Sequence, residues 1–153
     1  MNRQLLTAAL ALTLGAGYSL TALAQAKPET LVKQRQAAMA LQGKYFYQRL
    51  RPMAQGKVPY DANGAARDAE LLSALTKMPW DGFSASTKDL KTGALPVIYT
   101  DTGKFKESAD RLQSETAKLV ELTKKGDEAA VKAQILAVDK ACGACHDSFR
   151  EKQ

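Results

Sequence analysis

The sequence predicts an all-α protein folded as an antiparallel four-helix bundle. Apolar residues recur at intervals of three and four in four separate segments, which is the spacing of amphipathic helices. No segment shows the sustained alternation of apolar and polar residues that is typical of strands. Glycine and proline gather between the segments, and the short connections near residues 52–60 and 125–127 favour antiparallel neighbours.

The first 24 residues are expected to lie outside this bundle. They contain one cation, Arg3, then an apolar run from Leu5 to Leu14, and they end in Ala22-Leu23-Ala24. This pattern is typical of a secretory signal peptide cut after Ala24. An uncleaved membrane anchor is less favoured, because glycine, tyrosine and serine interrupt the apolar run. We expect a single mature domain, residues 25–153, located in the periplasm.

The charge of the mature chain argues against nucleic-acid binding. Removing residues 1–24 deletes Arg3 and no acid, so the formal net charge falls from +6 to +5. Lysine and arginine are dispersed among acidic residues, as on an ordinary solvated surface. A modest positive charge suits solubility and electrostatic attraction to acidic partners.

The first two helices have clear boundary signals. The first begins after Lys27, with Pro28 in its first turn, and is ended or loosened by Pro52 and Gly56. Its apolar positions are Leu31, Val32, Ala38, Met39, Leu41, Tyr45 and Phe46. The second begins near Asp61, a favourable N-cap. Its apolar positions are Ala65, Ala69, Leu72, Leu75 and Met78, and a long connection from Pro79 to Thr100 follows.

The last two helices are joined by a short turn at Gly126. The third is capped by Asp101 or Thr102 and ends near Lys125. Its seam consists of Phe105, Ala109, Leu112, Thr116, Leu119 and Leu122. The fourth opens with Asp127 and Glu128, whose negative charges suit a helix N-terminus. Its apolar stripe consists of Ala130, Val131, Ile135, Val138, Cys142, Cys145 and Phe149.

The segment Cys142-Gly143-Ala144-Cys145-His146 matches the pattern for covalent attachment of a c-type haem. In that pattern the two thiols bond to the haem vinyl groups and the histidine becomes an axial ligand of the iron. The small residues between the cysteines permit close approach of the backbone to the porphyrin. The sequence therefore indicates one covalent haem, held by Cys142 and Cys145, with His146 as metal ligand.

Other uses of this motif fit less well. A thioredoxin-like redox motif follows a strand, and no strand is predicted here. A structural zinc site needs four ligands, but the chain has no other cysteine or histidine. A catalytic Cys–His pair would also need a partner at a distance, which the only histidine cannot supply.

The ligand on the opposite side of the iron is left open by the sequence. That position is open to another residue, to a solvent molecule or to no ligand. No second histidine exists, so the candidate residues in the mature chain are Met39, Met53 and Met78. Met53 is expected in a loop and Met78 at the end of the second helix. Met39 is the best placed, on the apolar face of the first helix. Core packing of Met39 is favoured over iron ligation on spacing alone.

From about Lys27 to Lys152 the chain resembles the cytochrome c′ family. The more specific feature is the haem motif at the very end of the last helix, with Arg150 four residues after His146. Further matches are Lys27-Pro28-Glu29, Arg35-Gln36, Pro59-Tyr60-Asp61-Ala62, Leu75, Pro79-Trp80, Phe83 and Ala141 through Arg150. The resemblance implies a four-helix bundle with a five-coordinate, high-spin haem and histidine as the sole protein ligand.

The resemblance also implies roles for individual residues. Met39 occupies the position of the bulky apolar residue that shields the other haem face. Arg35 and Gln36 match residues that hold a haem propionate, a suitable partner for a guanidinium. Arg150 matches a basic residue beside the proximal histidine, one helical turn away.

The resemblance also covers two aromatic residues, and at Val97 this chain differs from some family members. Trp80 and Phe83 match haem-pocket aromatics, with ordinary core packing as an equal alternative. Val97 stands where some relatives place an acidic residue near the haem, so that contact is not expected here. Related low-spin cytochromes of the c-556 type use a methionine at the position of Met39 as sixth ligand.

Three classes of function follow. The first is binding of diatomic gases, nitric oxide or carbon monoxide, at the open haem face. The alternative is a low-spin electron carrier ligated by Met39, which meets a periplasmic redox partner through charge. An enzyme is the least favoured, because no distal histidine exists to act as acid or base. The resemblance further implies a homodimer through the first two helices, and no membrane association is expected after signal removal.

Overall fold

The computed structural model describes residues 26–152, and the predicted signal peptide lies outside these residues. The described chain is helical and contains no strand, apart from one isolated bridge between Ala94 and Arg150. Its α-helices are α1 Pro28–Tyr45, α2 Arg51–Ala54, α3 Ala62–Leu75, α4 Val97–Thr100, α5 Thr102–Lys125 and α6 Glu128–Phe149. Across residues 26–152, no helix is both long and apolar enough to cross a membrane.

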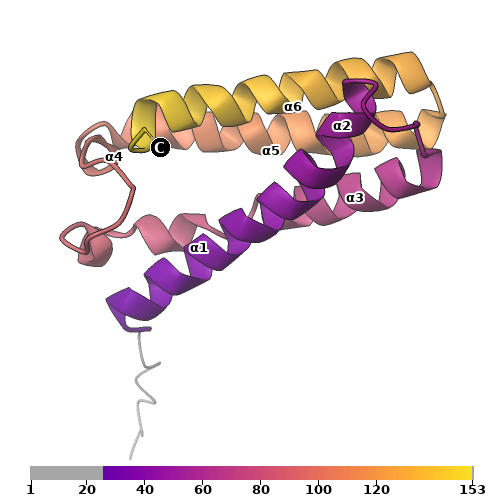
Figure 1. Cartoon of the computed structure of the whole chain (residues 1–153). Coiled ribbons are helices and arrows are strands. Elements are labelled where there is room, and N and C mark those ends of the chain that lie inside the picture. Colours follow the sequence, from indigo (N-terminus) through magenta and orange to yellow (C-terminus); the bar gives the residue numbers. More distant parts are fainter. Residues whose placement is uncertain (1–25, 153) are drawn as a thin grey trace, which may run out of the picture.

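The four long helices form the predicted bundle. Figure 1 shows α5 and α6 running side by side, with α3 along the other side of α5 and α1 crossing the bundle obliquely. The α1 helix packs against α3 and against the connection that follows α3. The amino-terminal end of α1 and the carboxyl-terminal end of α6 lie at the same end of the bundle, opposite the turn between α5 and α6.

The first helix continues past Pro52 as one irregular rod. A π-helical turn, η1 (Phe46–Leu50), joins α1 to α2, and the amide of Arg51 donates to the carbonyl of Phe46, five residues earlier. Proline lacks an amide hydrogen and clashes with a carbonyl one turn before it, and the wider turn of a π-helix relieves that clash. The helix ends at Ala54, and Gly56 follows with a φ of 68°.

The core lies where η1, α2, α3, α5 and α6 meet. Its buried residues are Phe46, Leu50, Met53, Ala65, Ala69, Leu72, Leu112, Leu119, Val131, Ile135, Val138 and Ala141. Eight of the eighteen positions predicted for the last three helices are in this set, and Leu75, Ala109, Thr116 and Phe149 are buried outside it. They share a side of their helices because side chains three and four residues apart lie on one helix face.

Two methionines and one leucine differ from the sequence prediction. Met53 was expected in a loop, but it lies within α2 and is buried in the core. Met78 was expected to continue the apolar face of the second helix, but α3 stops at Leu75 and Met78 is 61% exposed. Leu41 is exposed as well. The burial of these three side chains depends on where each helix ends and on which elements pack against it. The spacing of apolar residues along the sequence predicts neither.

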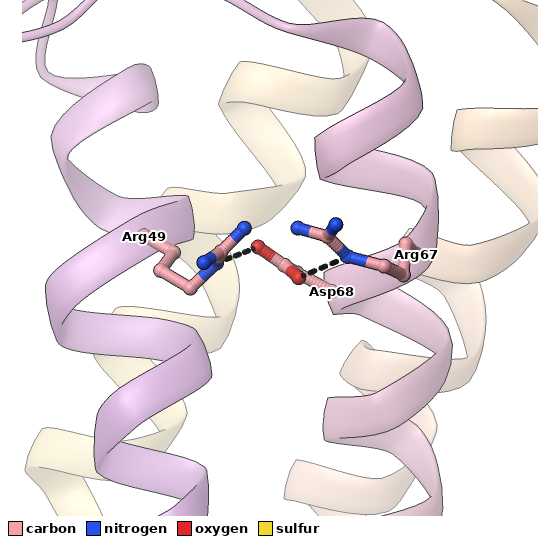
Figure 2. Close-up of polar contacts among 3 residues, drawn as sticks. All are labelled: Arg49, Arg67 and Asp68. Atoms are coloured by element: carbon pink, nitrogen blue, oxygen red, sulfur yellow. Dashed lines mark hydrogen bonds and ion pairs between the residues drawn. The ribbon is translucent and has the colours of Figure 1, made fainter.

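A buried carboxylate ties η1 to α3. Asp68 is fully buried, and Figure 2 shows its two oxygens facing Arg49 of η1 and Arg67 of α3. The Nε–Oδ distances are 2.5 Å for Arg49 and 3.0 Å for Arg67. Both guanidinium groups remain partly exposed. The two ion pairs therefore lie at the surface of the bundle, with the carboxylate of Asp68 on their buried side.

Of the aspartates predicted at helix N-termini, those of the third and fourth helices make a capping hydrogen bond. The carboxylate of Asp101 accepts from the amide of Lys104 at 3.3 Å, and that of Asp127 accepts from the amide of Ala130 at 3.1 Å. Gly126 ends α5 in a left-handed conformation, with a φ of 75°. Asp61 precedes α3 as predicted, but its side chain makes no capping hydrogen bond.

The long connection between α3 and α5 packs against α1 and against the end of α6. It contains two short 3-10 turns, η2 (Trp80–Phe83) and η3 (Ala85–Thr87), before α4. Its later part pairs with the end of α6, since the amide of Leu95 donates to the carbonyl of Phe149 at 3.0 Å. The amide of Glu151 returns a bond of 2.9 Å to the carbonyl of Gly93. This pairing closes one side of the candidate site.

Candidate haem-binding site

A cavity of about 510 Å³ lies between α1 and the carboxyl-terminal part of α6. The connection after α3 and the amino-terminal half of α5 complete its walls. Its lining is mainly apolar and aromatic, with a few polar groups: Arg35, Gln36, Met39, Gln42, Gly43, Phe46, Tyr47, Leu72, Trp80, Phe83, Thr92, Gly93, Ala94, Ile98, Phe105, Leu112, Cys142, Cys145, His146, Phe149, Arg150, Glu151 and Lys152.

The structure brings together all nine residues that the sequence analysis assigned to haem binding. Cys142, Cys145 and His146 line the cavity from the last two turns of α6. The other six reach it from α1, from η2 and from the residue after α6: Arg35, Gln36, Met39, Trp80, Phe83 and Arg150. Their individual roles toward a haem stay predictions.

Partial burial favours the neutral forms of the motif side chains. Burial raises the pKa of the Cys142 thiol to about 12, with smaller contributions from Asp139 and Cys145. Burial also raises the pKa of the Cys145 thiol. The pKa of His146 is lowered, first by burial and then by the positive charge of Arg150. A neutral imidazole is the form that binds a metal.

Arg35 is a buried cation at the edge of the cavity. It is 3% exposed and donates to the carbonyl of Gly82, to Oγ1 of Thr87 at 3.3 Å and to Oγ1 of Thr92 at 3.0 Å. Its guanidinium also lies 4.3 Å from the centroid of the Phe83 ring. These partners are all neutral. A buried guanidinium surrounded by neutral acceptors suits an incoming carboxylate, such as a haem propionate.

The aromatic residues form one connected group. Phe105 makes edge-to-face contacts with Trp80 at 5.8 Å, with Phe83 at 4.9 Å and with Phe149 at 5.2 Å between ring centroids. The indole of Trp80 donates to the carbonyl of Thr76 at 2.6 Å. This group joins η2, α5 and α6 and gives the cavity an apolar, aromatic wall, which suits a porphyrin.

The structure distinguishes among the three methionines proposed as iron ligands. Met39, which is half-buried on α1, lines the cavity, whereas neither Met53 nor Met78 is among its lining residues. Val97 is not among the lining residues. Met39 and His146 come from helices on opposite sides of the cavity, so they suit opposite faces of one planar group.

Sequence reasoning missed several lining residues, and Gln42 is the most informative of them. Gln42 follows Arg35 by seven residues and Met39 by three, so its position on the same helix face was available from periodicity. A glutamine in an amphipathic helix is ordinarily read as solvent-facing, which concealed it. Phe105 and Phe149 were predicted as core positions, and their contribution to the cavity required the packing of α5 against α6.

The residues at the cavity fit a c-type haem. The site supplies two thiols, an imidazole, a buried guanidinium and an aromatic wall in one cavity. Cys142 and Cys145 would hold the porphyrin, His146 the iron, and Arg35 with Gln36 a propionate. Such a group would supply a one-electron redox centre and a coordination position for a small ligand.

Comparison with known proteins finds relatives of one family. The family model described as cytochrome C′ matches residues 30–150. Cytochrome c′ from Rubrivivax gelatinosus is 39% identical over 127 residues, covering 82% of this chain and 98% of that protein. Its crystal structure superposes with a TM-score of 0.77 at 38% identity, with the same shares covered. A nitric oxide complex of a variant of cytochrome c prime from Alcaligenes xylosoxidans also gives a TM-score of 0.77, at 35% identity, covering 84% of this chain and 99% of that one.

Proposed function

Because this chain belongs to the cytochrome c′ family, we propose that it is a periplasmic monohaem c-type cytochrome that binds nitric oxide and carbon monoxide. The haem is attached through Cys142 and Cys145, and His146 is its sole protein ligand. The observation that carries the proposal is the cavity itself, with the attachment motif on α6 and an apolar residue, Met39, on the facing helix α1. The protein can also take part in electron transfer.

Gas binding follows from the character of the α1 wall. A five-coordinate iron has one open position, and an apolar pocket of limited size admits a small neutral ligand more readily than an anion. Met39 at this position slows access without closing the site. The nitric oxide complex of the relative from Alcaligenes xylosoxidans supports the same chemistry for this chain.

The competing proposal is a low-spin electron carrier in which the sulfur of Met39 binds the iron. Its specific support is that Met39 is the methionine lining the cavity within the described chain. Met/His ligation raises the reduction potential of a cytochrome and blocks the coordination position that a gas needs. The two proposals therefore make opposite predictions for gas binding.

Absorption spectra of the ferric and ferrous protein decide between them. The five-coordinate proposal predicts a broad high-spin ferrous Soret band that sharpens when carbon monoxide is added. A far-red methionine–iron charge-transfer band, with sharp α and β bands in the ferrous form, would refute it and establish the Met39-ligated carrier.

We propose further that the protein is exported, forms a homodimer and is not an enzyme. Leu41 and Tyr47 on the first helical rod and Leu71 on α3 are exposed apolar residues on the two helices expected at the dimer interface. Sedimentation equilibrium of the holoprotein tests the dimer, and Leu71→Lys should shift the equilibrium toward monomer. The redox partner is expected to carry an acidic docking surface that attracts the positive mature chain.

A further inference from the structure

The cavity holds a buried primary amide on the wall that faces His146. Gln42 lies on α1, one turn after Met39, and is 7% exposed. Its side chain lines the cavity together with Met39, Phe46 and Leu72. We propose that Gln42 supplies a hydrogen-bond donor to the bound gas and so tunes which diatomic ligands the site retains.

The hydrogen bond that Gln42 already makes fixes the orientation of its amide. Nε2 donates to the carbonyl oxygen of Leu75 at 3.1 Å. A carbonyl can only accept, so the NH2 group and not the oxygen points to Leu75. That NH2 group carries two hydrogens, and within residues 26–152 Leu75 is its only hydrogen-bond partner. The second hydrogen has no partner among these residues, and we infer that it is the one offered to a ligand in the cavity.

The end of α3 explains why the glutamine is held there. Leu75 is the last residue of α3, and the residue four positions later, whose amide would normally bond to its carbonyl, is Pro79. Gln42 provides the missing donor, alongside the amide of Met78 at 3.2 Å. The amide is therefore anchored by a structural contact and cannot easily rotate away from the cavity wall.

The apolar surroundings of Gln42 strengthen a hydrogen bond from its amide to a bound ligand. Near Gln42 the cavity is lined by apolar side chains, and a dipole fixed among them acts with little screening by water. A donor held close to the outer atom of a bound diatomic ligand stabilises the forms in which that atom gains negative charge. Arg35 is two helical turns away on α1, about 10 Å along the axis, and is engaged with the connection instead.

This inference rests on the proposed gas-binding function, and its test uses a spectroscopic signature. In the ferrous holoprotein, Gln42→Met keeps the length of the side chain and removes the donor. We expect the infrared stretching band of bound carbon monoxide to move to higher frequency. We also expect nitric oxide to dissociate roughly two- to tenfold faster, the effect of one lost hydrogen bond.

A matched control separates this role from a structural one. Gln134 is also a buried glutamine, whose Nε2 donates to the carbonyl of Glu115 at 3.0 Å, but it does not line the cavity. Gln134→Met should lower the melting temperature, as Gln42→Met also should, while leaving the carbon monoxide band and the nitric oxide rate unchanged. Equal bands in wild type and Gln42→Met would overturn the inference and leave Gln42 as a cap of α3 only.

A measurement on the unaltered protein guards against a variant that fails to fold. Amide hydrogens exchange with solvent, so transfer of the wild type to D2O should shift the carbon monoxide band if Gln42 donates to the ligand. A band insensitive to D2O would overturn the inference although gas still binds. If the ferrous protein forms no carbon monoxide adduct at all, the proposed function itself is refuted, and the inference with it.

Discussion

Replacing Gly82 by alanine tests how tightly the connection must approach α1 for the site to form. An added Cβ would lie 2.6 Å from Cβ of Arg35, 2.8 Å from the carbonyl oxygen of Leu31 and 2.9 Å from Cδ of Arg35. Two of these atoms belong to the backbone or the root of a side chain, so they cannot move aside alone. We expect Gly82→Ala to push η2 off α1 and to weaken the hydrogen bond from Arg35 to the Gly82 carbonyl.

The expected size of this effect follows from the contacts. Overpacking of a close contact costs about 1–3 kcal/mol of unfolding free energy. The matched control is Gly103→Ala, because Gly103 lies in the first turn of α5 and its added Cβ meets nothing within 4 Å. There we expect a gain of about 0.4–1 kcal/mol, since alanine restricts the unfolded chain.

Guanidinium denaturation of both holoproteins, followed by circular dichroism and by the Soret band, measures the two changes. Opposite signs are expected, and only Gly82→Ala should also alter the Soret band of the folded protein, because Arg35 and Phe83 line the cavity. A loss of less than about 0.5 kcal/mol for Gly82→Ala, within the range of ordinary surface substitutions, would refute the claim that this contact is tight.

Three further predictions concern attachment, access and pH. Cys142→Ser and Cys145→Ser should each leave a single thioether, and the double variant should lose all haem staining on a denaturing gel; retained staining would contradict covalent attachment there. Met39→Ala should accelerate carbon monoxide association roughly tenfold or more, the effect of removing about 1.4 kcal/mol of steric barrier, as stopped flow would show; an unchanged rate would exclude Met39 as the obstacle. The pKa of Asp101 is lowered by its side-chain hydrogen bond with Lys104, so its contribution to α5 is present above its ordinary value of 3.8 and is lost as the pH falls through the lowered pKa. Asp101→Asn should therefore lower the melting temperature more at pH 7 than at pH 3, and an equal loss at both pH values would contradict the charged contact.

The comparison of α1 with the other helices shows what local pattern could and could not predict. Its apolar spacing correctly placed Val32, Ala38 and Phe46 in the interior. The same spacing placed Leu41 on the apolar face, yet that side chain is exposed, and it overlooked Gln42, which is buried. The α1 helix crosses its neighbours obliquely and lines a cavity. Which of its side chains are buried therefore depends more on the neighbouring helices than on the hydrophobicity of the side chains themselves.

The sequence by itself determined the four long helices, the turn at Gly126 and the attachment motif. These depend on groups a few residues apart: a cysteine pair and its histidine, a glycine at the end of α5, aspartates at helix starts. Such local patterns can be recognised in the sequence without knowledge of the fold.

Only the tertiary structure decided what surrounds the motif. Arg35 meets the carbonyl of Gly82 across 47 positions of sequence, and Gln42 meets that of Leu75 across 33. Met53 lies in the core and not at the cavity, because η1 continues the first helix past Pro52. These contacts depend on which helix crosses which, and that is settled by burial of the whole set of apolar faces together rather than by any one segment.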